Sequence, residues 1–235
     1  MNNSEFLEVL KKSFLVYLQT GARSNEKLKV LHGAISADIN TRLNDRRYTV
    51  SSLGYGIGKE KTIDGRYMDK AVDITVSERG KAIAGVAVKF VMSNYAQNSN
   101  NYFENMLGET ANIRSAQIPY FQIFVIPEIL PYFDKKGNIS RWERITEHNL
   151  DKYIKLSYDN IDAFMHTPNK TLVYLVNLHG NSQPRITTMD EYKNYYLRNP
   201  FQIRPSTSTF KFGKTIVYND YETFSNKIVY AIKSI

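Results

Sequence analysis

Two segments of the chain are almost entirely apolar over the length of a strand, and they constrain the fold more than any other feature. They are IPYFQIFVIP at 118–127 and TLVYLVNL at 171–178. A strand with one solvated face alternates apolar and polar residues, whereas a strand covered on both faces carries a nearly continuous apolar run. We therefore expect a sheet that is buried between two layers of other structure.

Helical patterns supply these covering layers. Residues 4–20 carry apolar side chains at helical spacing until Gly21, and Ser24 caps the start of a second helix with a similar stripe. Further helices are predicted at about 102–114, 146–156, 188–198 and 220–234. The layers on either side of the sheet are therefore expected to be helical.

Three short strands precede the first all-apolar segment. They are predicted at 47–55, 70–76 and 82–91, and residues 56–66 form a Gly-rich, charged connection between the first two. Hairpin strands followed by a helical crossover imply a mixed sheet. We predict an α/β fold with a mixed central sheet flanked by helices, in a single domain spanning residues 1–235.

Composition narrows the classes of function. The 31 Lys and Arg residues exceed the 23 Asp and Glu residues, and the net charge of +8 suits a polyanionic partner. The absence of cysteine excludes disulfides, thiolate metal ligands and cysteine nucleophiles. Charged residues interrupt the N-terminal apolar segment, unlike a signal peptide, and no apolar run approaches the roughly 20 residues that span a bilayer. A cytoplasmic protein without membrane contact is expected.

One acid and one lysine stand out within the predicted strands. Asp73 lies between the apolar Val72 and Ile74, and Lys89 ends a Val-rich strand. Hairpin pairing places the two strands side by side, so the carboxylate and the ammonium can converge at one sheet edge. A lysine in such a strand is costly unless it is paired or functional, so the two residues form either a structural ion pair or part of a site.

Metal-dependent phosphodiester hydrolysis uses such a pair. The carboxylate binds a divalent cation, the cation activates water, and the lysine stabilises the reacting groups. Mg²⁺ commonly takes one or two carboxylates, but Ala87 occupies the strand position that would supply the second. Glu104, expected at the start of the following helix, is the natural replacement. Glu109 lies about 500° further round that helix, hence well off the face of Glu104.

The segments KAVD at 70–73 and VAVK at 86–89 resemble the signature of the PD-(D/E)XK nucleases. The resemblance covers a core of about 24–127 and leaves about 128–235 as a C-terminal elaboration. It implies a mixed sheet with flanking helices, cleavage of DNA, and a divalent cofactor, Mg²⁺, for which Mn²⁺ can substitute.

Some type II restriction endonucleases of this family carry their second acid on the helix after the lysine strand, and the spacing from Lys89 to Glu104 is similar to that variant. The resemblance implies that Asp73 and Glu104 are metal ligands and that Lys89 is the catalytic lysine. Val72 and Ala87 depart from the proline and the acid that the family usually has there. The second departure leaves open whether activity has been lost.

Other carboxylates remain open as the second acid. Glu109 follows Glu104 on the same predicted helix, and Glu60 lies in the Gly-rich connection. Members of the family often carry an acid on the helix before the sheet, a position that Asp38 or Glu26 would fill. Glu104 is the favoured second acid, and these carboxylates are its alternatives.

Polar and basic residues around this core are candidates for DNA contacts, because amides read base edges and cations neutralise phosphates. They are Asn98, Asn100, Asn101, Asn105 and Arg114 around the helix after the lysine strand, Lys59 and Lys61 in the Gly-rich connection, and Arg204 and Lys211 within 199–214. Helix capping and solvated loops are the alternative interpretation of these residues.

The histidines share no spacing typical of metal ligands, so we interpret each of them as a surface or core residue. They are His32, His148, His166 and His179. The segment GYGIGKE at 54–60 lacks the Lys-Ser/Thr ending of a phosphate loop and is interpreted as a flexible connection. Most of the 17 tyrosines are expected to pack in the core rather than to stack on bases.

Together these features predict a Mg²⁺-dependent type II restriction endonuclease that cuts double-stranded DNA, with a homodimer implied by the resemblance. A structure-specific repair or recombination nuclease is the alternative within the same chemistry. An inactive DNA-binding module is the alternative from another class, and Ala87 is the best argument for it.

Overall fold

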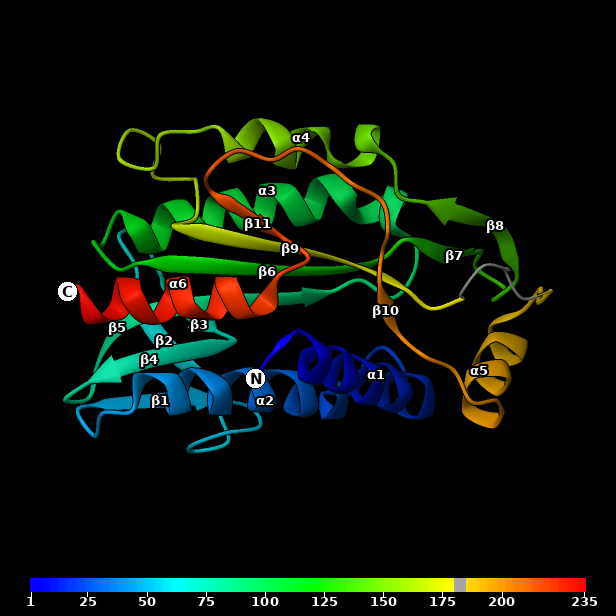
Figure 1. Ribbon diagram of the computed structural model, residues 1–235, viewed down its shortest axis with the longest axis horizontal. Coiled ribbons are helices and arrows are strands. Elements are labelled where there is room, and N and C mark those ends of the chain that lie inside the picture. Colours follow the sequence, from blue (N-terminus) through cyan, green and yellow to red (C-terminus); the bar gives the residue numbers. More distant parts are fainter. Residues whose placement is uncertain (180–184) are drawn as a thin grey trace.

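A seven-stranded mixed sheet forms the centre of the protein, whose computed structural model describes residues 1–179 and 185–235 (Figure 1). The strands, in their spatial order, are β1 (Tyr48–Ser52), β4 (Ile74–Glu78), β5 (Lys81–Phe90), β6 (Tyr120–Pro127), β9 (Lys170–Asn177) and β10 (Arg204–Pro205), with β11 (Ile216–Tyr218) also paired to β9. β5, β6 and β9 run parallel, whereas β1, β4 and β10 pair in antiparallel fashion. The predicted mixed sheet is confirmed.

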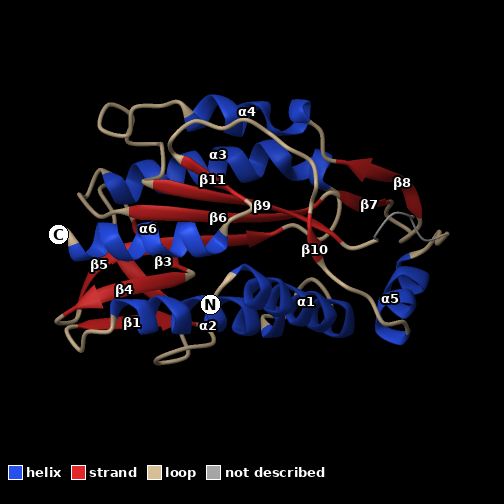
Figure 2. Ribbon diagram, viewed as in Figure 1, coloured by secondary structure: helices blue, strands red, loops and turns tan. Residues whose placement is uncertain are grey.

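Helices cover both faces of this sheet (Figure 2). One face packs against α1 (Asn3–Thr20), α2 (Glu26–Leu43) and α6 (Tyr221–Lys233), and the other against α3 (Tyr95–Arg114) and α4 (Glu147–Ser157). The short α5 (Met189–Arg198) packs against α1 through Tyr192 and Tyr196. Among the described residues, no helix combines the length and apolarity needed to cross a membrane.

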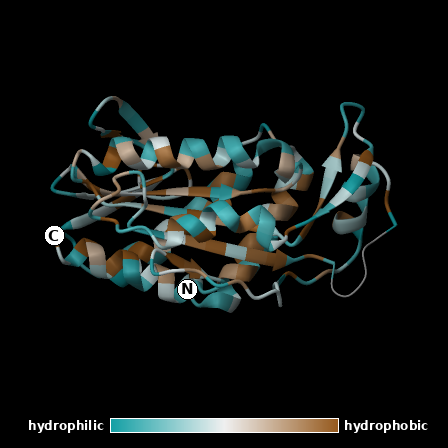
Figure 3. Ribbon diagram, turned by 90° about the horizontal axis from the view of Figure 1, so that it is seen from above, coloured by the Kyte–Doolittle hydropathy of each residue, from teal (hydrophilic) through white to brown (hydrophobic). Residues whose placement is uncertain are grey.

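The first all-apolar segment becomes β6, and all eight of its residues are buried. Its side chains alternate between two hydrophobic cores: Ile123 and Val125 belong to the core under α1, α2 and α6, whereas Phe124 and Ile126 belong to the core under α3 and α4. Figure 3 shows the apolar strands enclosed by helices with hydrophilic outer faces. The predicted burial on both faces is confirmed.

The predicted strand at 70–76 is divided in the structure, and its two halves pair with different partners. β3 (Asp69–Val72) forms a separate antiparallel hairpin with β2 (Lys61–Asp64), whereas β4 pairs with β1 and β5. Asp73 lies at the junction between β3 and β4. β2 itself lies inside the segment that was predicted to be a connection, so this prediction is corrected.

α3 begins at Tyr95, about two turns before the predicted start near residue 102. Its first turns are fixed by tertiary contacts that helical periodicity does not reveal. Tyr95 is 1% exposed and donates its hydroxyl to the Asn149 carbonyl oxygen at 3.1 Å. The Asn94 side chain exchanges two hydrogen bonds with the backbone of Phe133 in a second hairpin, β7 (Ile129–Phe133) and β8 (Ile139–Arg144).

Candidate metal centre

Two carboxylates meet at the open end of the β2–β3 hairpin. The last pair of the hairpin is Lys61 with Val72, and Glu60 and Asp73 are the residues that follow this pair on the two strands. Neighbouring strands of an antiparallel pair lie about 5 Å apart, so residues that flank the closing pair share one place in space. The switch of strand partner at Asp73 thus creates a two-carboxylate position from residues thirteen apart in sequence.

Asp73 is partly withdrawn from solvent, with a side chain that is 28% exposed. Its Oδ2 accepts a hydrogen bond from the Val88 backbone N–H at 2.7 Å. Burial raises the pKa of Asp73 to about 6, and the negative charge of Glu109 acts in the same direction, against the hydrogen bond from Val88 and the charge of Lys89. Lys70 and Lys89 offset part of the effect of burial on this carboxylate, and a bound cation would offset more.

His32, on α2, is buried beside this carboxylate. The residue is 0% exposed, and neither ring nitrogen has a hydrogen-bond partner in the described part of the chain. Its Nδ1 lies 4.0 Å from Oδ1 of Asp73. Burial lowers the pKa of His32 to about 4, although the charge of Glu60 opposes this shift, so the imidazole is neutral at pH 7. Leaving a buried polar group unpaired costs about 1–3 kcal/mol, and the neutral ring is the form that binds metals.

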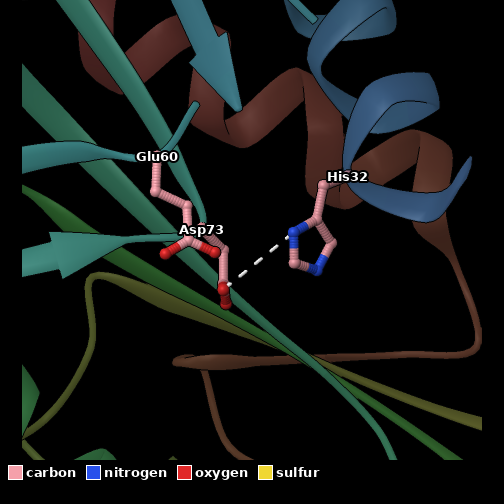
Figure 4. Close-up of side chains that lie close together, drawn as sticks. All are labelled: His32, Glu60 and Asp73. Carbon is pink, nitrogen blue, oxygen red and sulfur yellow. Dashed lines mark ion pairs between the residues drawn. The ribbon is translucent and has the colours of Figure 1, made fainter. Parts of the chain in front are cut away.

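The donor atoms of His32, Glu60 and Asp73 all lie within 4.8 Å of one another (Figure 4). In Figure 4 the imidazole of His32 points from its helix toward the two carboxylates. Ligand atoms bound at about 2.1 Å around one ion lie roughly 3 to 4 Å apart, so small side-chain movements would complete the coordination. The unpaired imidazole and the two neighbouring carboxylates are the donor types that a divalent cation would bind.

The close approach of two glycines holds α2 against the segment that leads to Glu60. A Cβ atom on Gly54 would lie 2.0 Å from the Lys29 carbonyl oxygen, and one on Gly33 would lie 2.8 Å from the Gly54 carbonyl oxygen. Both obstacles are backbone atoms, which cannot rotate away as a side chain can. Two residues without side chains are therefore needed to bring His32 and its helix to the hairpin.

Lys89, His32 and Asp73 line one open pocket of about 420 Å³ between α2, α3 and the sheet, whereas Glu60 lies close to His32 and Asp73 without lining this pocket. The ammonium of Lys89 lies 4.3 Å from the centre of the Tyr102 ring on α3, and the residue remains exposed at the pocket mouth. Partial burial lowers the pKa of Lys89, while the charges of Asp73 and Glu109 raise it. The structure thus brings together the acid and the lysine that the sequence singled out.

Glu104 is not part of this pocket, which corrects its expected position. The residue is exposed, and its charge acts on Lys152 of α4. The buried stripe of α3 includes Met106 and Ile113, and this stripe fixes which face of the helix meets the sheet. Glu104 lies off that face because each residue advances the helix by about 100°.

Glu109, by contrast, lines the pocket. Its Oε1 lies 2.5 Å from Nζ of Lys70, and its Oε2 accepts a hydrogen bond from the Tyr120 hydroxyl at 3.3 Å. The position is three residues after Met106 and four before Ile113, a spacing in the sequence that could have identified it. Glu109 therefore lies in the pocket but is already paired with Lys70.

The acids expected on the helix before the sheet are occupied elsewhere. Asp38 is 6% exposed and accepts hydrogen bonds from the hydroxyls of Tyr221 and Ser225 at 2.9 and 2.8 Å. Glu26 is paired with Lys29 at 2.6 Å on the exposed side of α2. Of the alternatives that the sequence left open, Glu60 lies with Asp73 and Glu109 lies in the same pocket.

The asparagines proposed for DNA contacts fall on different sides of α3. Asn105 lines the pocket, whereas Asn100 accepts a hydrogen bond from Lys152 at 3.0 Å. Asn98 donates to the Asn94 carbonyl oxygen within the helix, and Asn101 is exposed. The structure therefore places one of the four amides at the pocket.

Arg114, which the sequence suggested as a DNA contact, is engaged in structural contacts. The side chain is buried and donates hydrogen bonds to three backbone carbonyl oxygens. These carbonyls belong to Ile161, Phe164 and Thr167, so the guanidinium ties the end of α3 to the loop before β9. The guanidinium therefore has structural partners in the described part of the chain.

The remaining basic candidates are spread over the surface. Lys59 is exposed beside Glu60, whereas Lys61 donates to the Ser77 hydroxyl and the Gly80 carbonyl oxygen. Arg204 is exposed and bonded to Gln202, and Lys211 is exposed. Lys59 and Lys61 both adjoin Glu60 in sequence, and Lys59 is the more exposed of the two.

Sequence interpretation missed His32 as a possible donor, whereas Glu60 was one of the carboxylates left open as the second acid. The sequence indicated that each histidine is a surface or a core residue, and His32 lies in the core. Its proximity to Asp73 depends on tertiary packing, which the sequence does not reveal. Comparison of the chain with models of known protein families, with curated proteins and with solved structures found no match.

Proposed function

We propose that the protein is a divalent-metal-dependent nuclease that hydrolyses phosphodiester bonds in double-stranded DNA. The observation that carries the proposal is the pocket that Lys89 shares with His32 and Asp73, whose donor atoms also lie close to the carboxylate of Glu60. This arrangement agrees with the resemblance to PD-(D/E)XK nucleases, with Glu60 in place of the strand acid that Ala87 lacks. Cleavage at specific sites, as by a type II restriction endonuclease, and a homodimer are further parts of the proposal.

His32, Glu60 and Asp73 would hold the cation. When bound there, a divalent cation supplies an activated water molecule and offsets charge on the phosphate. Lys89 places its ammonium at the pocket mouth, where it can stabilise negative charge that develops on the phosphate oxygens. Asp73 acts in its ionised form, which its pKa of about 6 makes dominant at pH 7 and above.

The test is cleavage of supercoiled plasmid and of phage DNA in Mg²⁺ or Mn²⁺. We expect Asp73→Asn and Lys89→Ala each to lower the cleavage rate by about 1000-fold, since several kcal/mol of transition-state stabilisation would be lost. Asp64→Asn is the matched control, because Asp64 is an exposed acid in the same hairpin but outside the pocket. If the Asp73→Asn variant cuts DNA at the rate of the wild type, the proposal is contradicted.

The ends of the fragments decide the kind of nuclease. Sequencing that finds one motif at every end supports a restriction endonuclease, whereas cutting confined to flaps or junctions supports a repair enzyme. Ala87 favours one second candidate, an inactive DNA-binding module. Tight binding of DNA with no cleavage in either metal would support that module instead.

A further inference from the structure

The pocket continues past the metal donors to Lys27 and Gln122, which the roles proposed above do not use. Lys27 lies in the first turn of α2, and Gln122 lies on β6 in the floor of the pocket. The two residues come from different elements and are linked only by the pocket itself. Their chemistry therefore bears on what the pocket binds.

Gln122 is a polar side chain within a strand that is otherwise almost entirely apolar. It is 3% exposed, and its amide nitrogen finds no hydrogen-bond partner in residues 1–179 and 185–235. In the parallel pairing of β5 and β6 it lies opposite Ala87, so its side chain shares the sheet face of Ala87 and Lys89. Buried amides are normally paired, and a ligand in the pocket would provide the missing acceptor.

Lys27 is positioned before any ligand arrives. Its ammonium donates to the carbonyl oxygens of Ala22 and Ser24, both at 2.6 Å. An ammonium has three N–H donors, so a third is left for another acceptor. Burial lowers the pKa of Lys27, and the positive charge of Lys89 lowers it further. The two ammoniums therefore disfavour one another, and an anion between them would relieve this repulsion.

We propose that Lys27, Lys89 and Gln122 form an anion subsite that binds a phosphate group of a nucleotide beside the metal donors. The amide of Gln122 would donate from the floor and the two lysines from the rim. The pocket has the size of a small-molecule site, since such sites begin at about 300 Å³. The identity of the anion as a nucleotide phosphate rests on the proposed function; the requirement for negative charge rests on the three side chains.

The experiment measures binding of thymidine 5′-monophosphate to the full chain by NMR titration in EDTA, with thymidine as the probe without phosphate. We expect Lys27→Met and Gln122→Leu each to weaken binding of the monophosphate by about ten-fold, as expected for the loss of one hydrogen bond to a charged group. Thymidine should bind more weakly than the monophosphate to the wild type.

Lys29→Met is the matched control. Lys29 lies two residues after Lys27 on α2, is exposed, pairs with Glu26, and is not part of the pocket. Its substitution should change the affinity by less than two-fold. Equal weakening by Lys29→Met, unchanged binding in Lys27→Met and Gln122→Leu, or no preference of the wild type for the monophosphate over thymidine would each overturn the subsite.

Failure of this inference is distinguishable from failure of the nuclease proposal. If the wild type cuts DNA but the variants bind the monophosphate normally, only the anion subsite fails. If the monophosphate requires Lys27 and Gln122 but DNA stays intact in Mg²⁺ and Mn²⁺, the subsite stands and the nuclease proposal fails. The NMR spectrum of the folded wild type serves as the reference that shows whether both variants are folded.

Discussion

The two hairpins outside the central sheet each carry an acid beside their closing residue pair, and the partners of the two acids differ. Glu60 flanks the closing pair of the β2–β3 hairpin, and Glu128 flanks the closing pair of Ile129 with Arg144 in the β7–β8 hairpin. Glu128 accepts hydrogen bonds from the hydroxyls of Ser206 and Ser208 at 3.0 and 3.1 Å, and its carboxylate also pairs with Arg144.

Glu60 instead lies beside another carboxylate and an unpaired imidazole. The position of an acid at a hairpin base is therefore uninformative about its role. The partners distinguish the two acids, because a carboxylate surrounded by hydrogen-bond donors is already satisfied, whereas two carboxylates grouped with an unpaired imidazole fit the proposed cation. The predictions below test whether these two hairpin bases differ as the contacts imply.

The largest effect is expected for metal binding. His32→Leu replaces a ligand by an apolar side chain of similar size, and it should weaken binding of Mn²⁺ by about 10- to 100-fold, as measured by calorimetry. Glu128→Gln, at the other hairpin base, should leave the affinity unchanged. Equal affinity in the wild type and His32→Leu would remove His32 from the metal centre.

The next effect is on stability and concerns the other hairpin. Glu128→Ala leaves Ser206, Ser208 and Arg144 without their acceptor and should lower the free energy of unfolding by about 2 kcal/mol in urea titrations. Glu8→Ala, at an exposed position on α1, should change it by less than about 0.5 kcal/mol. A wild-type stability for Glu128→Ala would show that the second hairpin base is not a structural tie.

A smaller effect is expected on how stability depends on pH, and it differs between Asp73 and His32. The pKa of Asp73 is about 6 in the folded protein, above its ordinary 3.8, so its contribution to stability falls as pH rises from about 4 to about 6. The pKa of His32 is about 4, below its ordinary 6.5, so its contribution rises as pH rises from about 4 to about 6.5.

Urea titrations across this range without metal would measure both contributions. The wild type minus Asp73→Asn should give a stability difference that falls with pH, and the wild type minus His32→Leu should give one that rises. A difference that does not change with pH would mean that folding does not shift the pKa of that group, and a slope of the opposite sign would mean that the shift has the opposite direction.

The smallest effect is expected on the outer face of α3. Glu104→Gln should leave DNA cleavage within about two-fold of the wild type, because Glu104 faces Lys152 outside the pocket. Glu109→Gln, in the pocket, should have the greater effect on the cleavage rate. Loss of cleavage in Glu104→Gln alone would restore the acid that the sequence favoured.

Much of the fold was predictable because it depends on local patterns. The apolar runs gave β6 and β9, and helical spacing gave α1, α2 and α6 close to their observed bounds. β2 escaped because it is four residues long and partly charged, and the first turns of α3 escaped because Tyr95 and Asn94 are held by distant segments.

The part of the candidate site that could be predicted from the sequence is the part positioned by the pairing of two neighbouring strands. Asp73 directly precedes β4 and Lys89 lies on β5, so the pairing of β4 with β5 across a short turn brings them together. His32 reaches them only because α2 packs onto the segment around Gly54, a contact between residues far apart in sequence. Glu104 was preferred to Glu109 because the prediction relied on the expected start of α3. The buried residues of α3, which show which face meets the sheet, would have favoured Glu109.

The hairpin base also gives the site a reporter that needs no substrate. Glu60 and Asp73 lie just beyond the four residue pairs of β2 and β3, so an ion held by both would fasten the two strands where they leave the body of the protein. Opening of a short ribbon governs how quickly its amides exchange with deuterium. Slower exchange along β2 and β3 on addition of metal would therefore register occupancy of the centre even when no chemistry takes place.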